Sequence, residues 1–310
     1  MTASPLINQT FALSEKEIQS FAKDGFVLLK GLFAPKAIEV MQEITAEHIK
    51  PPSDNYGSGF SKLQYDIGND DPRLFSVIAD PLFSRSITDL CRESLFFTQG
   101  LGFELQKNVS SGFPWHVGTQ SFGFQRLSDL GVTLWTPLCE IIPATQGGQG
   151  GGMAYLSRKH LSGEFVYQHI QMIPEYLRQP IHDGSTFSTF SSLKNELLNS
   201  DTLRPLLDYY ATEDRFELGD ALLFDKWVMH RSAPLTDGPL NVRQAFAWRF
   251  SSTAARYDHV RVENLAYPRA RYHYDVGSPF NDIVAQNDGE LVYESDYFAS
   301  DRSARTLPYR

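Results

Sequence analysis

The sequence from residue 219 to residue 230 reads GDALLFDKWVMH. It opens on a Gly-Asp pair typical of a turn, continues through the apolar run 221–224, and ends on His230. A short apolar run bounded by turn residues predicts a buried strand. A second stretch, residues 113–120, reads FPWHVGTQ and places His116 among aromatic side chains. We therefore expect two histidines that each close a strand.

Along the chain, the predicted elements change from mostly helices near the N-terminus to mostly strands further on. Residues 14–17, SEKE, form a capping box that opens a helical N-terminal part over about residues 14–50. Short aromatic and β-branched segments predict strands, and the mixed stretch 161–215 reads as an insertion, a candidate lid. The predicted strands cover residues 95–98, 102–107, 131–138, 215–217, 221–224 and 243–251. This pattern predicts a single domain over residues 1–310 that is mainly β with added helices, a double-stranded β-helix or cupin-like jelly roll.

Composition excludes several classes of protein. The formal net charge is −9 and the pI is about 5.4, which disfavours partners such as nucleic acids and anionic membranes. Two cysteines, Cys91 and Cys139, cannot build a disulfide framework or a cysteine zinc cluster. The N-terminus lacks the features of a signal peptide, and no apolar run reaches the length of a membrane span. We expect a cytoplasmic protein.

The two histidine stretches, in this order and with an arginine after them, resemble the phytanoyl-CoA dioxygenase-like branch of the iron(II)/2-oxoglutarate dependent oxygenase superfamily. In that family a Trp-His strand supplies the first metal ligand, and a histidine after a Gly-Asp segment supplies the second. The resemblance implies that His116 and His230 bind iron(II). It also implies that Arg243 holds the far carboxylate of 2-oxoglutarate.

The chemistry of these residue types agrees with the resemblance. Two strand-borne histidines can hold iron(II) and leave positions open for the cosubstrate and dioxygen. Arg243 offers a planar fork that fits a carboxylate. Lys107, Trp135 and Arg249 are further candidates for contact with the bound cosubstrate or anion.

The sequence departs from the family at Gly118, where an Asp or Glu is the third metal ligand. Within the superfamily, His-x-Gly in place of His-x-Asp resembles the aliphatic halogenases, so His116, Gly118 and His230 are the predicted catalytic positions. Loss of the carboxylate frees one coordination position and one negative charge, which chloride or bromide can replace. Val117, Phe122 and Thr133 are expected to line the halide pocket with Gly118, and Arg249 is expected to act through water.

The resemblance favours a halogenase that chlorinates an aliphatic carbon of a small molecule of natural-product type. Two alternatives stay open: a hydroxylase of the same fold, and a non-catalytic relative that binds a small molecule. The aromatic residues Phe122, Phe124, Tyr155 and Tyr167 suggest an apolar or aromatic substrate, whereas an amino acid or an acyl group on a carrier protein is not excluded. The negative net charge makes an acidic carrier protein the less favourable partner.

Overall fold

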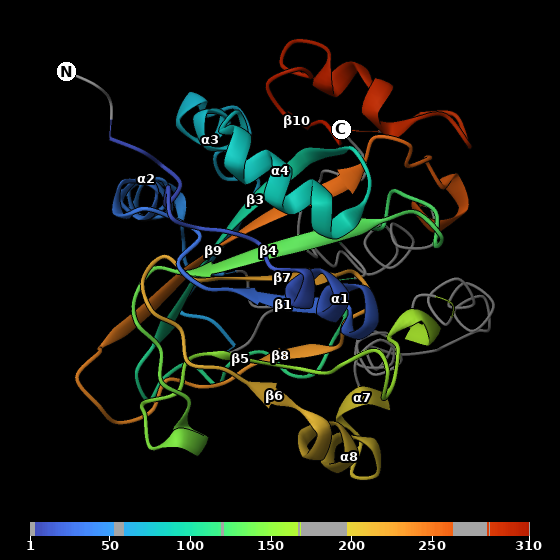
Figure 1. Ribbon diagram of the computed structural model, residues 1–310. Helices are drawn as coiled ribbons and strands as arrows, with labels where there is room; N and C mark the ends of the chain where they lie inside the picture. Colours follow the sequence, from blue (N-terminus) through green and yellow to red (C-terminus); the bar gives the residue numbers. More distant parts are fainter. Residues whose placement is uncertain are drawn as a thin grey trace.

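A large antiparallel sheet forms the centre of the molecule (Figure 1). The computed structural model describes residues 4–52, 59–118, 121–166, 168, 197–262, 284 and 286–309. Within these residues the large sheet has seven strands, in the order β1-β7-β4-β9-β3-β10 with β2 paired to β3. Its strands are β1 (Phe26–Leu29), β2 (Lys62–Tyr65), β3 (Leu95–Gln106), β4 (Gly131–Pro137), β7 (Ala221–Asp225), β9 (Val242–Ser252) and β10 (Thr306–Leu307).

A smaller sheet makes the second layer. In the described part of the chain it has three strands in the order β6-β5-β8. They are β5 (Met153–Tyr155), β6 (Thr212–Glu213) and β8 (His230–Ser232). In Figure 1 these strands lie below β7 and β1. The expected architecture, mainly β with added helices, is confirmed.

The N-terminal part follows the sequence prediction closely. Helix α1 (Glu15–Asp24) begins at Ser14, whose side chain accepts a hydrogen bond from the backbone of Glu17 while the Glu17 carboxylate accepts one from the backbone of Ser14. It ends at Gly25, whose φ of 82° suits a residue without a side chain. Strand β1 then pairs with β7, and α2 (Pro35–His48) follows.

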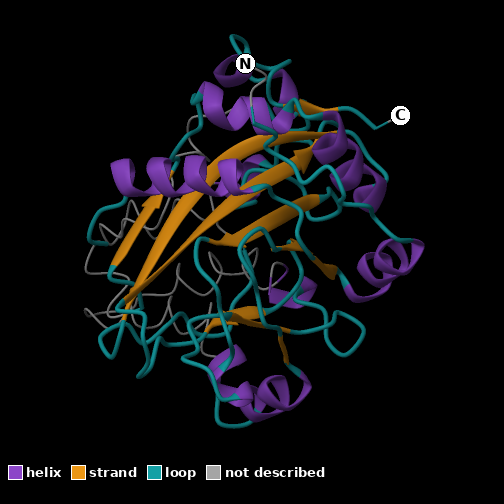
Figure 2. Cartoon of the chain, turned by 60° about the vertical axis from the view of Figure 1, so that its left-hand side comes forward, coloured by secondary structure: helices purple, strands orange, loops and turns teal. Residues whose placement is uncertain are grey.

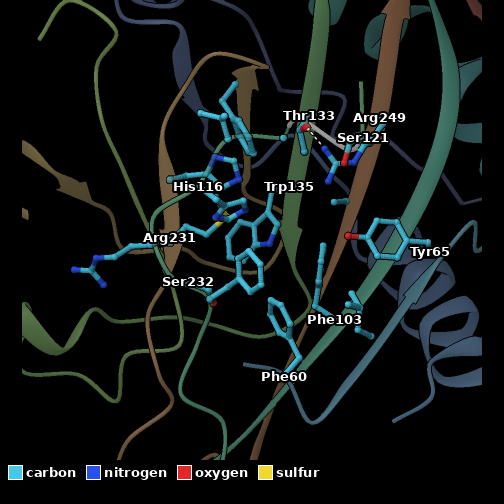
Figure 3. A pocket seen from close by; sticks show the side chains of 18 of the residues that line it. Phe60, Tyr65, Phe103, His116, Ser121, Thr133, Trp135, Arg231, Ser232 and Arg249 are labelled. Carbon is cyan, nitrogen blue, oxygen red and sulfur yellow. Dashed lines mark hydrogen bonds between the residues drawn. The ribbon is translucent and has the colours of Figure 1, made fainter. Parts of the chain in front are cut away.

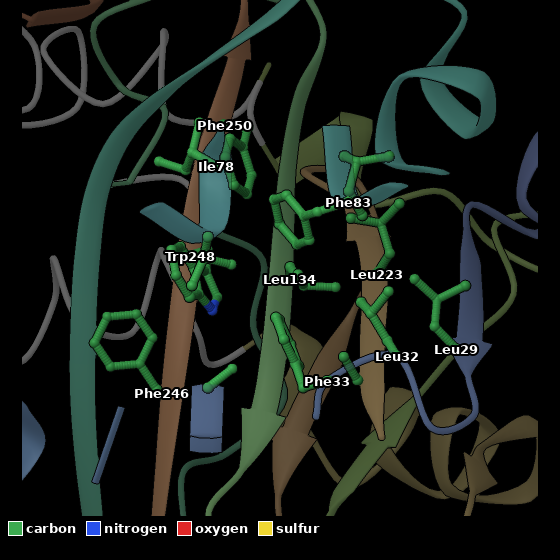
Figure 4. Close-up of a cluster of buried hydrophobic side chains, with 14 of the residues drawn as sticks. Leu29, Leu32, Phe33, Ile78, Phe83, Leu134, Leu223, Phe246, Trp248 and Phe250 are labelled. Atoms are coloured by element: carbon green, nitrogen blue, oxygen red, sulfur yellow. The ribbon is translucent and has the colours of Figure 1, made fainter. Parts of the chain in front are cut away.

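Helices cover one face of the large sheet (Figure 2). Besides α2, they include α3 (Pro72–Ile78) and α4 (Pro81–Cys91), which were not predicted. The core between helices and sheet is rich in aromatic residues (Figure 4). Phe83 of α4 lies with its ring centre 6.1 Å from that of Trp248 on β9. Burial of this face anchors the sheet and leaves its other face for a site.

Strand β9 divides its side chains between the two faces by simple alternation. Phe246, Trp248 and Phe250 belong to the core cluster that includes the helices. Arg243 and Arg249, six positions apart, therefore share the opposite face, toward the small sheet. Because β4 pairs with β9 in the register Thr133↔Arg249, Thr133 stands beside that arginine.

Several predicted strand limits were wrong. The two predicted strands 95–98 and 102–107 are one strand, β3, which ends at Gln106 and has a register irregularity between Phe97 and Gln99. His116 lies in an isolated bridge, and His230 opens β8 instead of closing a strand. The predicted strand 215–217 is only a bridge between Phe216 and Ile141.

The predicted lid over residues 161–215 falls largely outside the described residues. Its described end contains α7 (Leu197–Asn199), α8 (Leu203–Tyr210) and β6. Since β6 pairs with β5, this end belongs to the small sheet. Within the described ranges, no helix combines the length and apolar character needed to cross a membrane.

Candidate functional site

His116 and His230 face one another across a backbone bridge. The amide of each donates to the carbonyl of the other, at 2.9 and 3.0 Å. In such an antiparallel pair the two side chains leave on the same side. The imidazole ring centres are accordingly 4.1 Å apart. The bridge thus brings together two residues that are far apart in the sequence and presents their rings as a pair.

Hydrogen bonds to carbonyls fix the orientation of both imidazoles. Nδ1 of His116 lies 2.8 Å from the carbonyl of Pro114, and Nδ1 of His230 lies 2.9 Å from that of Val228. A carbonyl only accepts, so each Nδ1 carries a proton, and Nε2 is the nitrogen left for a metal. Burial lowers the pKa of His230 to about 4, with a smaller contribution from Arg249. Two imidazoles oriented in this way are suited to bind a transition metal.

Arg243 is a buried cation with an unmatched donor. Its side chain is 1% exposed, Nη2 donates to Ser232 Oγ at 3.1 Å, and Nε has no partner among the described residues. The guanidinium lies 5.6 Å from the ring centre of Trp135, and burial lowers the Arg243 pKa to about 10. A buried guanidinium with a free donor is costly unless an anion completes it. The site therefore fits a carboxylate.

Gly118 lies against a second arginine. A Cβ at Gly118 would stand 3.4 Å from Nη1 of Arg249 and 3.6 Å from Cδ2 of Phe122. The same Nη1 donates to Thr133 Oγ1 at 3.0 Å, and the guanidinium lies 5.6 Å from the Phe122 ring centre. In the residues that the structure describes, no cluster of three or more His, Cys, Asp or Glu could hold a metal. The described side chains at this point therefore offer two imidazoles, those of His116 and His230, as candidate metal ligands.

One cavity between the two sheets contains these groups (Figure 3). The space inside it, counting the part that is open to solvent, is about 870 Å³. Most of the predicted site residues line it. They are His116, Val117, Gly118, Thr133, Trp135, His230, Arg243 and Arg249. Phe122 is 1% exposed and lies beside Gly118, but it does not line the cavity.

Lys107 was expected to contact the cosubstrate or anion, but the structure places its side chain elsewhere. Strand β3 ends at Gln106, so the Lys107 side chain leaves the sheet, and its ammonium donates to the carbonyl of Gly238 at 3.2 Å. It does not line the cavity. Asp225, the last residue of β7, is 1% exposed, and its carboxylate pairs with Arg158 at 2.5 Å.

The aromatic residues expected at the substrate side are also different. Phe122, Phe124 and Tyr155 are buried in apolar clusters, and the side chain of Tyr167 lies outside the described residues. The cavity is instead lined by aromatic residues from the β2–β3 edge and from the segment before His116. They are Phe60, Tyr65, Phe103 and Phe113. Alternation along β3 could have indicated Phe103, but Phe60 is placed by a contact that the sequence pattern does not reveal.

The model of the phytanoyl-CoA dioxygenase (PhyH) family matches residues 21–242. The chain belongs to this family. The matched range includes both histidines and Gly118 and ends just before Arg243. No curated protein matches the chain in a sequence search.

Solved structures similar to this PhyH-family chain share its cupin-like jelly roll, which confirms the predicted fold class. SnoK, a non-heme alpha-ketoglutarate dependent carbocyclase from nogalamycin biosynthesis, has 15% identity and a TM-score of 0.58, over 82% of this chain and 89% of SnoK. The epimerase SnoN, solved with Fe3+, alpha-ketoglutarate and nogalamycin RO, has 12% identity and a TM-score of 0.57, over 93% of this chain and 96% of SnoN. HygX from Streptomyces hygroscopicus, with nickel and 2-oxoglutarate bound, has 15% identity and a TM-score of 0.51, over 78% of this chain and 88% of HygX.

Proposed function

We propose that this protein is an iron(II)- and 2-oxoglutarate-dependent halogenase that replaces an aliphatic C–H of a small molecule with chlorine. One observation carries the choice of halogenation: the Arg249 guanidinium faces the position at which Gly118 has no side chain. Family membership and the fold support the iron- and 2-oxoglutarate-dependent class more broadly.

His116 and His230 would hold the iron through Nε2, because both Nδ1 atoms are engaged with carbonyls. When bound, iron(II) would allow dioxygen to oxidise 2-oxoglutarate. This oxidation provides the reactivity needed to break a C–H bond of the substrate. The backbone bridge between the two histidines fixes their separation before any metal arrives. The depressed pKa of His230 keeps that ring free of a competing proton at neutral pH.

Arg243 would hold the distal carboxylate of 2-oxoglutarate. The pairing would supply the missing acceptor for Nε and neutralise a cation that is buried in an apolar setting. Ser232 fixes one edge of the guanidinium, and Trp135 packs over it. These contacts preorganise the fork, so little side-chain entropy is lost when the cosubstrate binds.

The halide would lie beside Gly118. The two imidazoles contribute no negative charge, so the site lacks the charge of the family carboxylate. Arg249 holds a positive charge toward that space, and Thr133 fixes its Nη1 in place. A chloride from solution would supply the missing negative charge and would pair with the Arg249 guanidinium. In the overall balance, substrate C–H, chloride, one proton, dioxygen and 2-oxoglutarate give the C–Cl product, water, carbon dioxide and succinate.

A succinate-release assay with iron(II), with and without chloride, tests this function. Halogenation predicts chloride-dependent succinate release and a chlorinated product from an accepted substrate. Succinate release that is indifferent to chloride, with a hydroxylated product, would instead assign a hydroxylase with water beside Gly118. His116→Ala and His230→Ala should abolish iron(II) binding, whereas His48→Ala, an exposed histidine on α2, serves as the matched control.

A further inference from the structure

One end of the cavity is an aromatic wall, which we define as Phe60, Phe103 and Phe113. The ring centre of Phe60 lies 5.4 Å from that of Phe103 and 5.7 Å from that of Phe113. In Figure 3, Phe60 and Phe103 lie on the far side of Trp135 from Thr133 and Arg249. All three phenylalanines line the cavity and are only partly buried. The wall therefore offers apolar surface at the end of the cavity opposite the proposed halide.

Phe113 connects the wall to the proposed metal site. The rings of Phe113 and His116 meet edge to face, with centres 4.5 Å apart and planes at 86°. A molecule lying on the wall would thus be adjacent to an iron held by His116. This position is where a substrate must lie if the oxidation is to reach one of its carbons.

The charged side chains around the cavity limit which class of molecule can bind at the aromatic wall. Among the described residues that line the cavity there is no aspartate or glutamate. Three arginines line it, and Arg231 is already neutralised by Asp208 at 3.1 Å and Glu213 at 3.0 Å. Its side chain also points away from the cavity in Figure 3. Under the proposed function the other two arginines are matched as well, by 2-oxoglutarate and by the halide.

We infer that the aromatic wall binds an uncharged, apolar substrate; the inference rests on the proposed function because it assigns Arg243 and Arg249 to other ligands. An ammonium group would enter a space with two buried guanidinium groups and no carboxylate on its described lining, and it would also face the iron. A carboxylate group would have to displace 2-oxoglutarate or the halide. An uncharged apolar molecule avoids both costs and gains from covering the three rings.

The test uses three probes of matched shape: 2-naphthylmethanol, its ammonium analogue 2-naphthylmethylamine, and 2-naphthoate. Binding to the full chain is measured by calorimetry under anaerobic conditions with iron(II), 2-oxoglutarate and chloride. We expect the alcohol to bind at least about tenfold more tightly than either charged probe. Phe60→Ala should weaken binding of the alcohol by about tenfold, and Phe60→Leu by less. Tyr209→Ala changes an aromatic residue that is 80% exposed and outside the cavity lining, so it should have no effect.

Equal or tighter binding of the ammonium probe would overturn the inference, as would unchanged affinity in a folded Phe60→Ala protein. Competition between 2-naphthoate and chloride would also overturn it, because Arg249 would then be a substrate carboxylate site. Repeating the titration without metal and chloride separates this inference from the proposed function. If the alcohol still depends on Phe60 there while chloride has no effect in the iron-loaded protein, the wall stands and halogenation fails.

Discussion

Arg249 directs Nη1 at the place where a side chain on Gly118 would begin, 3.4 Å from the Cβ position. The contact is ordinary in length, so the glycine is not forced by crowding at Cβ. Its consequence is electrostatic, because the Arg249 guanidinium borders a position at which the chain has no carboxylate.

Gly118→Asp should displace chloride from the iron site. The new carboxylate would meet Arg249 at pairing distance and supply the charge that the anion otherwise provides. Equilibrium binding of chloride to the iron(II) and 2-oxoglutarate complex measures the effect, and we expect it to be lost. Gly118→Ala is the matched control, since it adds a Cβ without charge and should retain chloride binding. Retained chloride affinity in Gly118→Asp would place the halide elsewhere.

Arg243→Ala should cost about 2–5 kcal/mol of 2-oxoglutarate binding, the range for a buried hydrogen-bonded charge pair that loses one partner. Arg243→Lys should also weaken binding, because a point charge cannot reproduce the planar fork. Direct titration with 2-oxoglutarate provides the measurement. Normal affinity in Arg243→Ala would move the anchor to Arg249.

Arg243 should lower the stability of the ligand-free protein, although it strengthens the binding of 2-oxoglutarate. Without cosubstrate, Arg243 is a 1% exposed cation with an unmatched Nε in the described structure. Arg243→Met removes that charge and keeps an apolar side chain of comparable length, so the melting temperature of the ligand-free protein should rise. Adding 2-oxoglutarate should then stabilise the native protein but not the variant. A variant that melts lower than the native protein would contradict this account of the Arg243 environment.

Asp225 should make stability depend on pH through its partner Arg158. Burial raises the pKa of Asp225 to about 6, and Arg158, the amides of Trp227 and Val228, and Lys226 oppose the rise. Between about pH 4 and about pH 6 the folded protein keeps a proton that the unfolded chain has released, so this group makes stability fall as pH rises.

Arg158→Ala should therefore destabilise the protein by about 2–3 kcal/mol at pH 7.5, at the low end for buried pairs because the Arg158 side chain is 30% exposed. The loss should be much smaller at pH 4.5, where Asp225 is protonated. Urea unfolding at the two pH values measures the difference. Arg85→Ala, which removes an 81% exposed partner of Asp89, should have no effect at either pH. An equal loss at both pH values for Arg158→Ala would show that the charge of Asp225 is not involved.

Much of this arrangement could be predicted from the sequence because local rules decide it. The Ser14 capping box sets the start of α1, and the apolar run 221–224 sets β7. Both histidines and Arg243 were expected at one site from the resemblance to the ordered motifs of a family, and all three line the cavity. The starts of α3 and α4 were also readable, because Asp71-Pro72 and Asp80-Pro81 each combine a cap with a proline at the first helical position.

The errors concern features that tertiary contacts decide. Lys107 was expected at the site because the strand was extended by one residue beyond Gln106, which turned its side chain the wrong way. Tyr155 was expected beside a substrate, yet β5 directs its side chain into the core. Its ring centre lies 4.7 Å from that of Phe26. Phe60 reaches the cavity by packing on two other rings, and no sequence period encodes such a contact.

The glycine-rich stretch 147–152 supports the segment that leads into β9. Gln149 exchanges hydrogen bonds with both backbone groups of Leu240, at 2.5 and 2.9 Å, just before the strand that carries Arg243. A Cβ at Gly151 would stand 3.6 Å from Nε of Arg243. Gln149→Ala should cost about 1–3 kcal/mol of stability, because it leaves the Leu240 groups unpaired.

The same variant should weaken 2-oxoglutarate binding, because it loosens the segment that positions Arg243, while iron(II) binding by the two histidines stays normal. Gln19→Ala, which removes an exposed hydrogen bond to Glu15, is the control and should change neither property. If Gln149→Ala lowers stability but leaves the affinity for 2-oxoglutarate intact, the loop supports the fold without positioning the anchor.

The most direct test of the central claim is a chloride titration of the anaerobic protein loaded with iron(II), carried out with and without 2-oxoglutarate. If chloride fills the vacancy beside Gly118, it should change the visible charge-transfer band of the iron(II) and 2-oxoglutarate complex. Chloride and 2-oxoglutarate should also raise each other's affinity by the same factor. A band and a 2-oxoglutarate affinity that stay constant from zero to saturating chloride would contradict a halide site at Gly118.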